Sequence, residues 1–124
     1  MKAYGKKTWI VPEGYIPKGS NGQAPEMTSH ESISILNTSD KKANIQIYIY
    51  YTDRDPIGPY KLSVGPRRSK HIRFNDLTDP QPIPLVTEYS SLIESDIPVV
   101  VQHTRLDSRQ AENALLSTIA FGTN

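Results

Sequence analysis

The chain has 124 residues, the usual size of one domain, and it has no cysteine, so it must fold without disulfides. Its 14 lysines and arginines nearly balance 13 aspartates and glutamates, and this formal net charge of +1 excludes a general attraction to nucleic acid or anionic lipid. No segment approaches the roughly 20 apolar residues of a membrane-spanning helix, and no signal sequence is evident. We therefore expect one soluble, cytoplasmic domain over residues 1–124 that inserts into no membrane.

Alternation of apolar and polar residues, the pattern of a half-buried strand, dominates the first half of the chain. It is strongest over residues 45–52, where isoleucines alternate with polar and aromatic residues, and it is repeated more briefly over residues 32–35. A polar segment rich in turn formers, residues 37–42, separates the two. Further short strands are predicted over residues 60–64 and 69–74, on either side of a Gly-Pro turn.

The second half of the chain predicts the remaining strands and the fold class. Residues 75–84 hold three prolines, which exclude a central strand there. Strands are predicted over residues 86–93, 98–106 and 115–121, and the last of them follows a polar loop or one-turn helix at residues 108–113. Short strands at this spacing predict an all-β fold, a single-domain β-sandwich or jelly-roll-like architecture of about eight strands.

Several polar residues lie on faces that the strand pattern predicts to be apolar. Glu31 is expected on the buried side of its strand, and His103 and Arg105 continue the valine-rich face of the residues that precede them. Apolar walls with a few converging polar groups are typical of a pocket for a small polar ligand. The alternative is that Arg105 only pairs with Glu31 or Asp107 at the edge of the core.

No motif in the sequence favours metal binding or catalysis. His30, His71 and His103 are widely separated and form no His-x-His pair, so no metal is expected. The chain has no Gly-x-Ser-x-Gly elbow, no cysteine nucleophile and no glycine-rich phosphate loop. We therefore expect neither a cofactor nor an enzyme activity.

A local basic run is the feature that favours nucleic acid. It comprises Arg67, Arg68, Lys70, His71 and Arg73, of which the last two share a strand face, and tyrosines elsewhere offer surfaces for stacking. Solvated charge beside a Gly-Pro turn is ordinary, and the whole chain is balanced in charge. Weak, salt-dependent DNA binding therefore stays open as an alternative.

Several stretches of unusual sequence distinguish this chain from a generic β protein. They are Trp9, residues 13–17, 29–31, 49–51, 58–60 and 70–77, and above all Val-Gln-His-Thr-Arg-Leu-Asp-Ser-Arg-Gln-Ala-Glu-Asn-Ala over residues 101–114. In these stretches, and over nearly its whole length, the chain resembles the soluble sensory rhodopsin transducer family.

The resemblance implies a compact β-sandwich that assembles as a homotetramer and acts as a non-enzymatic signal transducer in the cytoplasm. It implies a small-molecule ligand such as a sugar or another metabolite, or contact with a membrane-bound sensory rhodopsin, and DNA binding is a further implied role. It also supports one shared site for the polar motif residues Trp9, Glu13, His30, Glu31, His71, Arg73, Gln102, His103, Arg105 and Asp107. Within this set, we expect Trp9 to stack on the ligand and the following residues to hydrogen-bond it: Arg73, Gln102, His103 and Arg105.

Overall fold

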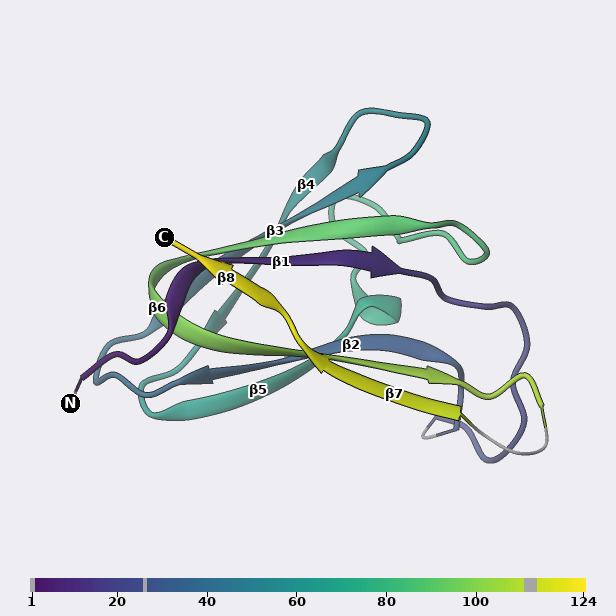
Figure 1. The fold of residues 1–124 in the computed structure, drawn as a ribbon, viewed down its shortest axis with the longest axis horizontal. Helices are drawn as coiled ribbons and strands as arrows, with labels where there is room; N and C mark the ends of the chain where they lie inside the picture. Colours follow the sequence, from purple (N-terminus) through teal and green to yellow (C-terminus); the bar gives the residue numbers. More distant parts are fainter. Residues whose placement is uncertain (1, 26, 111–113) are drawn as a thin grey trace.

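The computed structural model describes residues 2–25, 27–110 and 114–124, and it confirms the all-β prediction. Within these residues, eight antiparallel strands form one connected sheet, and the regular structure besides them is a 3-10 turn, Phe74–Asp76 (Figure 1). The same residues contain no helix long and apolar enough to cross a membrane. The strands are β1 (Lys6–Gly14), β2 (His30–Asn37), β3 (Ala43–Tyr51), β4 (Ile57–Val64), β5 (Arg68–Arg73), β6 (Tyr89–Asp107), β7 (Ala114–Ile119) and β8 (Phe121–Thr123).

The longest strand, β6, joins two layers of this sheet because its 19 residues belong to both. Its first half pairs with β1 and β3, and β8 and β4 extend that layer on either side. Its second half pairs with β2 and β7, and β5 completes the second layer beside β2. Figure 1 shows the two layers as an upper and a lower group of strands that share β6.

The two strands predicted over residues 86–93 and 98–106 are one continuous strand in the structure, β6. The strand runs through Pro98 without a break. This proline lies between Ser95, the last residue of β6 that pairs with β3, and Val100, the first that pairs with β2. The ladder with β1 is irregular at this point, between Glu94 and Val99, and none of the ladders with β1, β2 and β3 pairs Pro98, so its missing N–H disturbs no cross-strand pair.

The two ends of the chain also differ from the prediction. The final strand divides, because β7 ends at Ile119 and pairs with β6 whereas β8 begins at Phe121 and pairs with β1. The sequence pattern does not predict β1, since Pro12 interrupts its apolar segment. In the structure Pro12 is exposed, at a point where the pairing with β6 is irregular. Residues 111–113 lie outside the described residues, so the predicted loop or helical turn over residues 108–113 is not tested there.

The core lies between the two layers and follows the predicted alternation. The isoleucines of β3 are buried, whereas Gln46, which lies between two of them, and Tyr50, which follows the last, are exposed. Phe74, fully buried after β5, packs edge-to-face on Tyr89 with 5.8 Å between the ring centroids. Burial of this apolar surface is the main stabilising contribution to such a fold.

A buried asparagine, Asn37, holds the turn between β2 and β3. Its amide donates to three backbone carbonyls, and its Oδ1 accepts from the N–H and the hydroxyl of Ser39. We expect Asn37→Ala to lower the free energy of unfolding by about 2–3 kcal/mol, because several buried polar groups lose their partner. In urea unfolding, Asn44→Ala, which removes an exposed amide, should cost less than about 1 kcal/mol. Equal losses would contradict the structural role of Asn37.

Candidate functional site

A fully buried carboxylate, Glu31, lies at the start of β2, opposite Arg105 of β6. Its Oε2 accepts hydrogen bonds from the backbone N–H of Tyr15 at 2.8 Å and from Arg105 Nε at 2.5 Å. Its Oε1 bonds His103 Nε2. A buried carboxylate needs donors and a positive charge in place of water, and Glu31 has both.

Polar contacts among the segment before β2, the 3-10 turn after β5 and the segment after β6 hold Glu31 in place. Ser29 Oγ accepts a hydrogen bond from the N–H of Ser108 at 2.9 Å, and both serines are buried. The side-chain amide of Asn75 donates to the carbonyl of Ser29 at 3.0 Å, and its Oδ1 accepts from the N–H of Glu31 at 3.4 Å. These contacts fix the backbone just before Glu31 and so direct its side chain between the layers.

Arg105 connects this buried carboxylate to the surface. Its Nη1 donates to Glu13 Oε1 at 3.3 Å, and the exposed fraction of the side chain rises from 0 % at Glu31 to 20 % at Arg105 and 78 % at Glu13. Burial alone would lower the pKa of the Arg105 guanidinium, but its hydrogen bonds to Glu31 and Glu13 raise that pKa above its ordinary value. Arg105 is therefore a permanent cation with one inner and one outer carboxylate.

A small cleft opens beside these side chains, between β1 and the segment that joins β7 to β8. Its volume is about 180 Å³, and its lining consists of Val11, Pro12, Glu13, His103, Arg105, Thr118, Ile119 and Ala120. Most of this wall is apolar, and His103 and Arg105 reach it from β6. A largely apolar wall with a few converging polar groups is the usual form of a small-ligand site.

The structure brings four of the predicted site residues into one hydrogen-bonded network, which we call the Glu31 network: Glu13, Glu31, His103 and Arg105. It places three others on the outer face of the second layer. The isoleucines of β2 point into the core, so the serines between them lie on the outer face, and His71 and Arg73 of β5 pair with these serines. Gln102 of β6 is exposed, and the residues on either side of it are buried, so it also lies on the outer face. A ligand in the cleft therefore meets His103 and Arg105 but lies on the other side of the sheet from these three.

The remaining predicted residues make local contacts outside the cleft lining. Trp9 is 6 % exposed, and its indole N–H is shared between two backbone carbonyls. His30 Nδ1 contacts a backbone carbonyl at 2.7 Å. Hydrogen bonds from Arg109 lower the pKa of Asp107. We accordingly leave these residues out of the site proposed below.

Several residues of the site have no signal in the sequence pattern. Tyr15 contributes only its backbone N–H, and a backbone donor leaves no signature in the residue types. Val11 lines the cleft from β1, a strand that the pattern does not predict. Thr118 and Ile119 reach the cleft only because the last strand divides between two layers, which no local pattern signals.

Two tyrosine hydroxyls add buried polar atoms to the interior. Tyr51 and Tyr89 face each other across β3 and β6, and neither hydroxyl has a partner in the part of the chain that the structure describes. Burial, together with the negative charge of Glu31, raises the pKa of Tyr89 well above its ordinary range. Burial also raises the pKa of Tyr51, although Arg54 opposes it. Both side chains thus remain neutral phenols at physiological pH.

Neither a metal centre nor a basic cleft emerges from the described residues. Across residues 2–25, 27–110 and 114–124, no group of three histidine or carboxylate side chains is placed to hold a metal ion. The basic run lies along β5 and the turn before it, where Arg67, Arg68, Lys70 and His71 are exposed. This surface is separate from the cleft lining.

These features define an all-β protein with a small cleft beside a buried glutamate–arginine–histidine network. The chain belongs to the family described as "Anabaena sensory rhodopsin transducer", because the model of that family matches residues 4–122. The resemblance drawn from the sequence motifs is thereby confirmed.

The solved structures that are similar to this chain include the following two. One, named "Anabaena sensory rhodopsin transducer", is 51% identical with a TM-score of 0.77, and the match covers 86% of this chain and 100% of that one. The other, "Crystal Structure of Thermotoga maritima 1070", is 36% identical with a TM-score of 0.83, and the match covers 96% of both chains. The search of curated proteins gave no match.

Proposed function

We propose that this protein is a non-enzymatic signal transducer that binds a small polar molecule in the cleft between β1 and the β7–β8 segment. The observation that carries the proposal is the pair His103 and Arg105, which present polar groups to a largely apolar cleft that Glu13 and Thr118 also line. The family supports a signalling role, since the similar solved protein is named as a transducer. The cytoplasm is the compartment in which we place it.

The Glu31 network offers a route by which an occupied cleft changes the rest of the molecule. A ligand that hydrogen-bonds Arg105 or His103 alters the partners of Glu31, which also accepts a hydrogen bond from the backbone of Tyr15 and is the second residue of β2. The same ligand contacts Val11 of one layer and Thr118 of the other. Binding therefore stabilises one arrangement of the two layers over others, which is what relaying a signal requires.

A thermal-unfolding screen against sugars, nucleotides and common metabolites tests this function. A ligand at about 100 times its Kd stabilises the fold by about 2.7 kcal/mol. We expect the shift to disappear in Arg105→Met and in Thr118→Trp, which fills the cleft from an exposed position. Arg54→Met removes an exposed guanidinium elsewhere and should keep the shift. A screen without any shift, or a shift that survives both cleft variants, would contradict the proposal.

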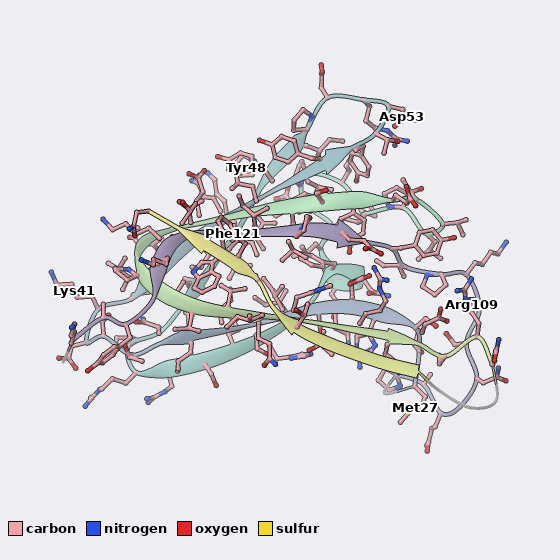
Figure 2. All side chains as sticks on the ribbon, in the orientation of Figure 1. Met27, Lys41, Tyr48, Asp53, Arg109 and Phe121 are labelled. Atoms are coloured by element: carbon pink, nitrogen blue, oxygen red, sulfur yellow. The ribbon has the colours of Figure 1, made fainter. Side chains whose placement is uncertain are left out.

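A second candidate is an adaptor that docks on a membrane-bound sensory rhodopsin or assembles as a homotetramer. Exposed apolar side chains favour it, because Ile119 is 66 % and Phe121 64 % exposed beside the cleft, and Figure 2 labels Phe121 on the C-terminal strand. Large exposed apolar side chains that lie together are typical of interfaces. Loss of receptor capture, or of the tetramer in sedimentation, on Phe121→Ser would support this candidate, and unchanged behaviour would contradict it.

A further inference from the structure

The two carboxylates on Arg105 differ in how firmly they are held. Glu31 is fully buried, lies 2.5 Å from Arg105 Nε and is fixed by further donors. Glu13 is 78 % exposed, and its Oε1 lies 3.3 Å from Arg105 Nη1. The inner pair is therefore structural, whereas the outer pair is a weak surface contact that a competing group can replace at small cost.

The outer contact occurs at the cleft itself. Glu13 and Arg105 both line the cleft, so the contact between Arg105 Nη1 and Glu13 Oε1 joins two residues of its wall. A guanidinium prefers carboxylates above neutral acceptors, because the charge-assisted hydrogen bonds are stronger and its planar donors match both oxygens. Glu13 thus stands where the carboxylate of a ligand would lie.

The remaining wall restricts the body of such a ligand. Val11, Pro12, Ile119 and Ala120 form an apolar surface, and a compact molecule matches the cleft volume of about 180 Å³. Among the lining residues, the partner for an organic cation is Glu13, which Arg105 already contacts. A polyol is disfavoured by the apolar wall, which would leave its hydroxyls without partners.

We propose that the ligand of this cleft is a small carboxylic acid with a compact apolar body, and that Glu13 is a built-in competitor that the ligand displaces from Arg105. This inference rests on the ligand-binding role proposed above and names the chemical class of the ligand. The incoming carboxylate takes the place of Glu13, so Arg105 keeps one inner and one outer carboxylate partner.

Three probes with the same apolar body test the chemical class: isovalerate, its neutral amide isovaleramide and the cation isopentylamine. Isothermal titration at constant ionic strength should detect isovalerate and give binding at least about tenfold weaker for the other two, because they lack the charge-assisted contact. In Glu13→Gln, the affinity for isovalerate should rise by up to about fivefold, since the weak surface pair of Glu13 with Arg105 no longer has to be broken. Glu88→Gln, which removes an exposed carboxylate outside the cleft lining, should bind as the unaltered protein does.

The outcomes separate this inference from the proposed function. Tighter binding of isovalerate by Glu13→Gln, with no change in Glu88→Gln, would support displacement. Equal binding of acid and amide, preference for the amine, or an unchanged or weaker affinity in Glu13→Gln would overturn it. If a neutral compound from the wider screen binds and depends on Thr118 and Arg105, the ligand-binding function stands and only the carboxylate assignment fails.

Discussion

We expect Glu31→Gln to lower the free energy of unfolding by about 3 kcal/mol, because it removes one charge from a buried pair. Glutamine keeps the size of the side chain but not its negative charge, so Arg105 and His103 lose the partner that offsets their burial. The side chain of Arg105 is 20 % exposed and gains little water in compensation. Urea unfolding at neutral pH, followed by the fluorescence of the single tryptophan, measures the loss.

Glu13→Gln is the matched control, because it removes the other carboxylate of the same arginine. Its side chain is 78 % exposed, and an exposed pair of this kind contributes at most about 1 kcal/mol. We therefore expect a clear difference in unfolding free energy between the two variants. If Glu31→Gln and Glu13→Gln lower the unfolding free energy by the same small amount, the charge of Glu31 is not needed in the interior and the Glu31 network does not stabilise the fold.

The second large effect is expected for Phe74→Ala, which should cost about 3–5 kcal/mol of unfolding free energy. Phe74 is fully buried between the layers and packs edge-to-face on Tyr89, so its removal leaves a cavity and ends that ring contact. The chain has only one other phenylalanine, Phe121, which is 64 % exposed on β8. Phe121→Ala therefore makes the same chemical change outside the core.

Denaturant unfolding of the two phenylalanine variants compares the unfolding free energy lost at a buried and at an exposed position. We expect Phe121→Ala to change the unfolding free energy by no more than about 0.5 kcal/mol in the monomer. A comparable loss at both positions, measured at low protein concentration, would contradict the placement of the core between the two layers.

Local alternation predicted most of the strands, because one side of each strand faces the core and the other faces water. This holds for β2 and β3, whose isoleucines are buried as the pattern indicates. It fails where the environment changes along a strand. Pro98 looks like a strand boundary in the sequence, but it lies where β6 passes from one layer to the other and needs no ladder partner.

The site was predictable in part for the same reason. Glu31, His103 and Arg105 occupy positions that alternation places on buried faces, so their convergence follows from adjacent strands. His71 and Arg73 were assigned to a common face, but only the pairing of β5 with β2 shows that this face is the outer one. The contributions of Tyr15 and Thr118 depend on tertiary pairing and have no counterpart in the residue types.

The most direct test of the central claim is a ¹⁵N-correlated NMR spectrum that includes arginine Nε–H signals, recorded with and without the best compound from the screen. The account predicts that the largest shifts fall on the Arg105 Nε–H and on the backbone signals of Val11, Glu13 and Thr118, which surround the cleft. Shifts confined to the exposed face of β5, or an Arg105 signal unchanged at saturating ligand, would show that the molecule binds elsewhere and that the cleft is not its site.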